Sequence, residues 1–500
     1  MKRLHEAALK KCAGTANYGN INKRCSEVAN SKKFNSKNIT TEESHMNYKK
    51  TICTLFTLIH CTLLPTTYWK WQNINIHSIQ FPQSFEWGLT TLSYEVEGYS
   101  KSSTWYAWEN HTGNNSKTPF TTTRSGNAAA HSQNYKEDIQ LMKEMGITTY
   151  CFSIDWSRVE PEQGHFDESV LQHYADICDE LIKNNISITV ILKDYCDPLW
   201  WGYLGGFEYE KNLHLFERYC LKMHETLSTR VDRWITFWAP ENYATLGYLV
   251  GTTPPGIRNL HRAATVLKNE FEAHVRVYKK IKNAPHGNNT CIGIIKHMHL
   301  LEPWHLWDKP SCYIANMLTN NSFYNFFTTG VFNIKIPLPG KAGAWVKHVN
   351  HYAPKSLDFI GINYHSHGYL KNITNHVSNP GETATDVAGI TVYPEGLYFA
   401  IKNVSDNLAK KLNIPMIITQ NGIATHDESI RDLFIKRHIY AVSKAKADGY
   451  NVEGYYYYSF LDGFSWGNYD TQFGLFSVDR TTMKRTLKNG AHYFCDVINK

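Results

Sequence analysis

Five side chains that can transfer protons or bind metals lie within or just after short apolar runs: Glu95, Cys151, Asp194, Glu241 and His365. Carboxylates and imidazoles act as general acids and bases, and side chains of these types are also ligands of divalent metals. If they converge they form a candidate acid–base or metal site, but if they bond to one another they need no ligand. Glu241 can instead be a capping residue where a loop begins. We predict neither a bound metal nor a cofactor.

These residues need a scaffold, and eight apolar runs indicate what it is. The runs are nearly continuous and rich in β-branched and aromatic residues, which is typical of strands buried on both faces of a parallel sheet. They cover residues 85–91, 148–156, 187–195, 233–240, 291–298, 358–365, 415–421 and 452–462. Amphipathic stretches between them predict helices at 137–145, 168–183, 260–282, 396–412 and 432–447.

This alternation predicts an α/β fold, a single (β/α)8 TIM barrel with long βα loops. The alternative is a doubly wound open sheet with a second domain. In a TIM barrel the chemistry lies at the C-terminal ends of the strands. We therefore expect any site to be at that end, which we call the mouth of the barrel.

The first 68 residues differ from the rest of the chain. Residues 1–45 are a polar extension that we expect to be disordered, and residues 46–68 place Lys49 and Lys50 before an apolar run, as a signal peptide does. This pattern predicts a secreted or endoplasmic-reticulum lumenal protein, with a signal anchor or a buried segment as alternatives. The barrel is expected over residues 77–497.

The net charge of +7 lies entirely in residues 1–68, where 11 Lys and Arg residues face 4 Glu residues. The rest of the chain has 41 basic and 41 acidic residues. A formally neutral barrel gives no electrostatic reason to bind DNA, RNA or an anionic membrane. We expect no nucleic-acid partner and no strong membrane-surface attraction beyond the signal-like segment.

Glycosylation sequons agree with secretion, although each motif alone is weak. The candidate sites are Asn110, Asn114, Asn288, Asn320, Asn372 and Asn403. Seven cysteines follow the signal-like segment, so at least one thiol has no partner within the chain, and no Cys/His spacing suggests zinc.

Several motifs at the predicted strand ends resemble those of glycoside hydrolase family 1, the group of β-glucosidases, lactase and Klotho. They are Phe85-x-Trp87-Gly88, Ser93-Tyr94-x-x-Glu97-Gly98, Phe152-Ser153-Ile154-x-Trp156, Asp358 to Tyr364, Tyr393-Pro394-Glu395-Gly396 and Phe473-Gly474-Leu475. The resemblance implies a (β/α)8 barrel and a retaining β-glycosidase mechanism, which needs two carboxyl groups about 5–5.5 Å apart.

Neither catalytic carboxyl group is present where the resemblance implies one. The general acid falls on Ala239, between Trp238 and Pro240, and the nucleophile falls on Gln420. A methyl group has no proton to donate, and an amide lacks the charge and the nucleophilic oxygen of a glutamate. General acid catalysis alone contributes about 10²–10⁴-fold, and loss of the nucleophile removes the covalent route.

The resemblance also implies residues that hold the sugar, and several of these have changed. The positions concerned are occupied here by Glu95, Asp194, Cys151, His365 and Ser465. The predicted ligand pocket comprises Glu95, Asp194, Tyr195, Trp238, Asn363, Tyr364, His365, Gln420, Tyr458, Ser465 and Trp466. We expect Trp238 to fill this pocket, with a stacking platform for a ligand as the alternative.

The sequence therefore predicts a catalytically inactive glycosidase-like barrel that binds an unknown protein or glycan. One alternative is an enzyme repurposed for non-hydrolytic chemistry with Glu95, Asp194, His365 or Cys151 as its acting groups. The other is residual β-glucosidase activity through Glu241.

Overall fold

The computed structural model describes residues 68–76, 79–110, 123–371, 375–377, 382–387 and 390–499. The predicted polar extension lies outside these residues, as does the signal-like segment except for Tyr68. The sequons at Asn114 and Asn372 also lie outside them.

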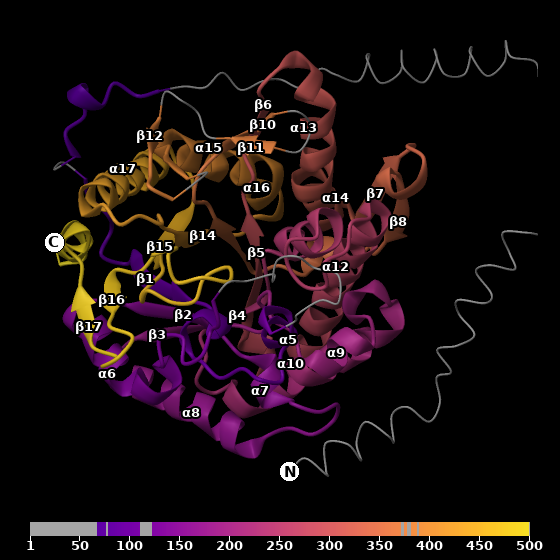
Figure 1. The fold of residues 1–500 in the computed structure, drawn as a ribbon, viewed down its shortest axis with the longest axis horizontal. Coiled ribbons are helices and arrows are strands. Elements are labelled where there is room, and N and C mark those ends of the chain that lie inside the picture. Colours follow the sequence, from indigo (N-terminus) through magenta and orange to yellow (C-terminus); the bar gives the residue numbers. More distant parts are fainter. Residues whose placement is uncertain are drawn as a thin grey trace, which may run out of the picture. The chain divides into compact units, whose positions relative to one another are not determined.

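A closed barrel of eight parallel strands forms the centre of the described structure (Figure 1). The strands are β1 (Glu86–Thr91), β2 (Thr149–Ser153), β3 (Ser187–Ile191), β4 (Arg233–Trp238), β5 (Cys291–His297), β9 (Phe359–Asn363), β14 (Met416–Asn421) and β15 (Val452–Tyr458). Their order is β1-β15-β14-β9-β5-β4-β3-β2, and β1 also pairs with β2. The eight predicted strands are confirmed, and the closure of the sheet rules out the open-sheet alternative.

Helices lie outside the strands, among them α6 and α8 beside β2 and β3, and α15 and α17 beside β14 and β15 (Figure 1). The longer ones are α6 (His131–Glu144), α8 (Glu168–Lys183), α10 (Leu213–Leu227), α12 (Leu260–Lys282), α15 (Pro394–Val404) and α17 (Glu428–Ala447). The shorter ones are α4 (Ser93–Val96), α5 (Thr104–Glu109), α7 (Trp156–Val159), α9 (Leu199–Tyr203), α11 (Pro240–Ala244), α13 (Lys309–Asn316), α14 (Ser322–Thr329), α16 (Lys410–Leu412) and α18 (His492–Ile498). The predicted bounds of α8 and α12 match.

Side-chain caps explain where two of these helices begin. Asp167 accepts backbone hydrogen bonds from Ser169 and Val170 at the start of α8, and Asn259 accepts one from Arg262 at the start of α12. Each cap satisfies a backbone donor that a helix N-terminus otherwise leaves open. The predicted helix 396–412 is instead α15, a π-helical segment at Ser405–Ala409, and α16.

The barrel interior is packed with side chains. Ile191, Ile235, Ile295 and Ile417 belong to one buried cluster with aromatic rings near the mouth. A larger apolar layer lies between the strands and the outer helices. The interior is therefore a core, and ligands can approach only at its ends.

The long βα loops carry short strands that the sequence analysis did not predict. They are β6 (Leu301–Pro303), β7 (Val331–Ile336), β8 (Ala344–Val349), β10 (Gly368–Lys371), β11 (Asn375–Val377), β12 (Thr383–Ala384), β13 (Thr391–Val392), β16 (Phe476–Val478) and β17 (Arg485–Leu487). Among the described residues, no helix combines the length and apolar character that a membrane crossing requires.

Candidate functional site at the barrel mouth

The parallel strands bring the chemistry-bearing residues to one end of the barrel. Trp238, Asn363 and Tyr458 are the last residues of β4, β9 and β15, and Gln420 is the penultimate residue of β14. Glu95 lies on α4, directly after β1. Because all eight strands run in the same direction, these side chains gather at the mouth, as predicted.

Gln420, at the position of the missing nucleophile, is fully buried and hydrogen-bonded. Its Oε1 accepts from Trp238 Nε1 at 2.8 Å and from Asn363 Nδ2 at 2.7 Å. Asn363 is oriented in turn by Thr419, whose hydroxyl donates to Asn363 Oδ1 at 2.8 Å. Within the described structure Gln420 Nε2 makes no hydrogen bond. The amide is therefore enclosed between two strand ends, with its oxygen already bonded.

Four aromatic rings cover this amide. Tyr195 stacks on Trp466 with ring centroids 5.1 Å apart and lies edge-on to Trp238 at 5.8 Å. Trp105 of α5 packs edge-on against Tyr195 at 5.3 Å. Trp238 and Tyr195 are only 4% and 6% exposed. Such pairs add about 0.5–1.5 kcal/mol beyond area burial. The indole of Trp238 is thus buried among aromatic rings and bonded to the amide at the position of the missing nucleophile.

Glu95 is buried beneath these rings and bonded to hydroxyl groups. The hydroxyl of Tyr195 donates to its Oε1 at 3.1 Å, and the hydroxyl of Tyr458 donates to its Oε2. Burial raises the pKa of Glu95 to about 7, although these hydrogen bonds and one with Ser465 lower it. The carboxyl group is therefore half protonated near neutral pH and already has its partners.

Asp194 is also satisfied from within the protein. It accepts hydrogen bonds from Ser93 Oγ at 3.0 Å, from Ser153 Oγ at 2.7 Å and from the backbone N–H of Cys196 at 2.7 Å. Burial raises its pKa, and the charge of Lys193 opposes that shift. Asp194 thus fixes the strand ends of the mouth and has few lone pairs left for a ligand.

His365 lies on the opposite side of the mouth beside two histidines that the sequence analysis missed. Its Nδ1 lies 2.9 Å from the carbonyl oxygen of Gly422, so that nitrogen carries the proton, and its ring stacks near His297 at 5.9 Å. Burial lowers the pKa of His365 to about 4, so the imidazole is neutral. The spacing His297-x-His299 at the end of β5 was the signal available in the sequence.

These groups do not form a metal centre in the described residues, where no three His, Cys, Asp or Glu side chains are placed to hold an ion. His299 Nε2 is instead bonded to Asn242 Oδ1. The imidazoles of His297 and His365, whose pKa values burial lowers, therefore pack as neutral rings.

Glu241, the carboxylate considered as a substitute acid, is fully buried. It forms a fully buried ion pair with Lys296 at 3.2 Å and accepts the backbone N–H of His297. Successive side chains of a strand alternate between faces; Ile295 belongs to the interior cluster, so Lys296 and its partner face the outer helices. Ala239 itself is buried in a left-handed conformation with φ of 44°.

Two further predicted site residues are packed in the core, one in the outer layer and one inside the barrel. Tyr364 lies one residue past β9, its hydroxyl donates to the carbonyl oxygen of Tyr393 at 2.9 Å, and it packs in the outer layer rather than at the mouth. Cys151 is buried inside the barrel near Tyr456, and burial raises its pKa to about 12. A thiol with that pKa is not a nucleophile at neutral pH.

One glycosylation candidate is also corrected. Asn320 is buried, and its amide nitrogen donates to the carbonyl oxygen of His299 at 3.2 Å and to Asn316 Oδ1 at 2.8 Å. A glycan on that nitrogen is incompatible with these contacts. Asn110 and Asn288 are exposed and Asn403 is half-buried, so they stay predictions.

Comparison with known proteins decides what kind of barrel this is. The sequence profile described as glycosyl hydrolase family 1 matches residues 77–500. The chain belongs to glycosyl hydrolase family 1. This confirms the resemblance that the strand-end motifs predicted, and a glycosidase-family barrel is the scaffold on which the altered mouth is built.

The relatives of this family 1 chain include glycosidases and a transferase. Beta-glucosidase A of Thermotoga maritima is 28% identical over 84% of this chain and 98% of the relative. The chloroplastic galactolipid galactosyltransferase SFR2 of Arabidopsis thaliana is 26% identical over 72% of this chain and 56% of the relative. The solved structure of a beta-glycosidase from Pyrococcus horikoshii has a TM-score of 0.73 and 30% identity, covering 84% of this chain and 95% of that one.

Proposed function

We propose that this family 1 barrel does not hydrolyse glycosides and instead binds a protein or glycan ligand. The observation that carries the proposal is the hydrogen bond from Trp238 Nε1 to Gln420 Oε1. It joins a side chain that fills the sugar position to an amide that replaces the nucleophile. Fold alone does not determine function, so the argument rests on these side chains.

The side chains at the positions of the acid and of the nucleophile both support the loss of hydrolysis. A retaining mechanism needs a proton donor and a carboxylate nucleophile, and Ala239 and Gln420 supply neither. The nearest carboxyl group after β4, that of Glu241, is enclosed with Lys296 on the outer side of the barrel wall. Glu95 and Asp194 are bonded to hydroxyl and N–H groups under the aromatic rings.

A non-hydrolytic enzyme is the second candidate, favoured by one observation. The pKa of Glu95, about 7, suits a general acid–base near neutral pH. This candidate requires the rings of Tyr195 and Trp466 to separate, because they close the route to Glu95. The relative named as a galactosyltransferase gives a precedent for family members with a transfer activity.

The proposal is tested by incubating the purified protein with aryl β-glucosides. Release of the aryl group is expected to equal that of buffer alone, for the wild type and for Glu241→Gln. Release by the wild type that Glu241→Gln abolishes would contradict the proposal, and would also contradict the outward position of that carboxyl group. Release by the wild type that Glu95→Gln abolishes would also contradict the proposal, and would assign the reaction to Glu95.

We also propose that the protein enters the secretory pathway through the segment at residues 46–68. The basic residues before a short apolar run support it. N-terminal sequencing of protein collected from the culture medium should give a first residue after the apolar run. A secreted chain that begins near Met1 would contradict this proposal.

A further inference from the structure

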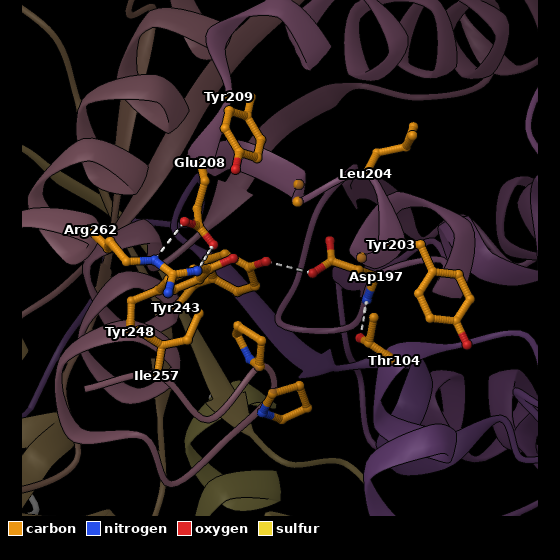
Figure 2. Close-up of a pocket in the computed structure, with 15 residues that line it drawn as sticks. Thr104, Asp197, Tyr203, Leu204, Glu208, Tyr209, Tyr243, Tyr248, Ile257 and Arg262 are labelled. Carbon is orange, nitrogen blue, oxygen red and sulfur yellow. Dashed lines mark hydrogen bonds and ion pairs between the residues drawn. The ribbon is translucent and has the colours of Figure 1, made fainter. Parts of the chain in front are cut away.

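A cavity of about 310 Å³ opens beside the mouth (Figure 2). Its walls come from α5, the loop that follows β3, the loop that follows β4, and the start of α12. Its lining includes Tyr203, Glu208, Tyr209, Tyr248, Pro254 and Arg262. Small-molecule sites are clefts of roughly 300–1,000 Å³, so the volume is sufficient for a small ligand.

The rim of this cavity presents aromatic faces to solvent. Tyr209 is 53% exposed and lies at the cavity edge above Glu208, whereas the ring of Tyr203 is 81% exposed and points away from the cavity. Gly205 permits this arrangement, because a Cβ atom there would lie 2.4 Å from the Tyr209 ring. Pro254 and Tyr248 add further ring surfaces. Exposed aromatic rings around a hollow mark an interaction site more often than isolated apolar residues do.

The polar groups of the cavity are balanced in charge. Glu208 makes a bidentate pair with Arg262, whose Nε donates at 2.6 Å. Asp197 accepts from the hydroxyl of Tyr243 at 2.7 Å and lies 3.2 Å from Lys193 Nζ. Each carboxylate thus has its own cation, and the cavity offers acceptors and donors without a net charge that would attract an ion.

The arrangement disfavours a cationic ligand for a second reason. Lys193 Nζ lies 4.4 Å from the centroid of the Tyr243 ring, so a cation already occupies one aromatic face next to the cavity. A quaternary ammonium ligand is normally held by free aromatic faces and uncompensated negative charge. The second condition fails here, because Arg262 compensates Glu208 and Lys193 compensates Asp197.

We propose that this cavity binds a neutral sugar ring at the end of a glycan. An apolar C–H face of the sugar ring would lie against Tyr209, while its hydroxyls would bond to the Glu208–Arg262 pair. The inference rests on the proposed binding function and specifies the chemistry of the ligand. It places that ligand beside the closed mouth, outside the former catalytic pocket.

The test uses the full-length protein and three methyl hexosides with gluco, galacto and manno configuration. Binding is measured by saturation-transfer NMR and by titration. At least one hexoside is expected to bind, and Tyr209→Ala and Glu208→Gln should each raise its Kd about tenfold, the value expected for loss of one good contact. Tyr313→Ala on α13 is the matched control, because that tyrosine is also exposed and does not line the cavity.

Several results would overturn the inference. One is that none of the three hexosides binds. Another is that a hexoside binds with a Kd that Tyr209→Ala and Glu208→Gln leave unchanged. Binding of tetramethylammonium that Tyr209→Ala weakens would show a cation site instead. If Tyr209→Ala fails to fold, the Kd of Glu208→Gln decides the outcome. Aryl-glucoside release tests the proposed function separately, so either idea can fail alone.

Discussion

The mouth of the barrel and the cavity beside it are built by neighbouring βα loops, yet the surroundings of their carboxyl groups differ. In the mouth, Glu95 is bonded to tyrosine hydroxyls and covered by rings that exclude water. In the cavity, Glu208 pairs with Arg262 and the tyrosine rings remain exposed. The residues of the mouth are thus packed as part of the core, whereas the cavity beside them is open to solvent. This contrast predicts different responses to equivalent substitutions.

The largest effect is expected where an arginine holds the loops of the mouth together. Arg431 is fully buried and donates to the carbonyl oxygens of Ile423, Thr425 and Gln472. Arg431→Ala should lower the free energy of unfolding by about 3–5 kcal/mol, because buried acceptors lose their donor. Arg262→Ala in the cavity should cost less than about 1 kcal/mol. Urea unfolding of both variants measures the difference, and equal losses would contradict the contrast.

Removal of the ring that fills the mouth should have the next largest effect. Trp238→Ala is expected to cost about 3 kcal/mol, because it leaves a void and takes a donor from Gln420. Tyr209→Ala at the cavity rim should stay within about 0.5 kcal/mol. Thermal or urea unfolding gives both values. A Trp238→Ala variant as stable as the wild type would mean that the indole does not pack as a core residue.

A third prediction concerns pH. Burial raises the pKa of Glu95 to about 7, so the folded chain binds this proton more tightly than the unfolded chain. Its contribution to stability is present below the unfolded pKa of about 4.3 and is lost as the pH rises through about 7. The free energy of unfolding should fall by on the order of 1–3 kcal/mol more in the wild type than in Glu95→Gln over this interval. Identical pH profiles would show that Glu95 is ionised in the folded protein.

The smallest effect should separate binding from stability in the cavity. Glu208→Gln keeps the size of the side chain and removes one partly exposed ion pair, so the free energy of unfolding should change by less than about 1 kcal/mol. Circular dichroism during thermal unfolding provides this measurement. A large loss of stability would mean that the Glu208–Arg262 pair is structural.

The barrel could be predicted because each of its strands is a nearly continuous apolar run in the sequence. Runs such as 291–298 are buried on both faces, and periodicity alone separates them from the amphipathic helix at 260–282. The short strands β7 and β8 lie in a long loop and pair only with each other. In β7 the buried Phe332, Ile334 and Ile336 alternate with exposed Asn333 and Lys335, so a period-two strand signal was present in the sequence and was missed.

The sequence predicted which residues lie at the strand ends of the mouth, but not how their side chains are bonded to one another. The family motifs place Trp238 and Gln420 at strand ends, but their mutual hydrogen bond depends on side-chain orientation. Tyr364 was misplaced because one residue beyond a strand end decides the face on which a side chain lies. The cavity joins Glu208 to Arg262, which are distant in sequence and belong to no motif.

The central claim is that no group in the mouth can form a glycosyl ester. Intact-mass spectrometry after incubation with a 2-deoxy-2-fluoro-β-glucoside of dinitrophenol tests it most directly, because that leaving group needs no acid and the fluorine slows hydrolysis of the ester. The account predicts no increase in mass of the wild-type chain. An adduct that peptide mapping assigns to Glu95, Asp194 or another carboxyl group of the mouth would contradict it.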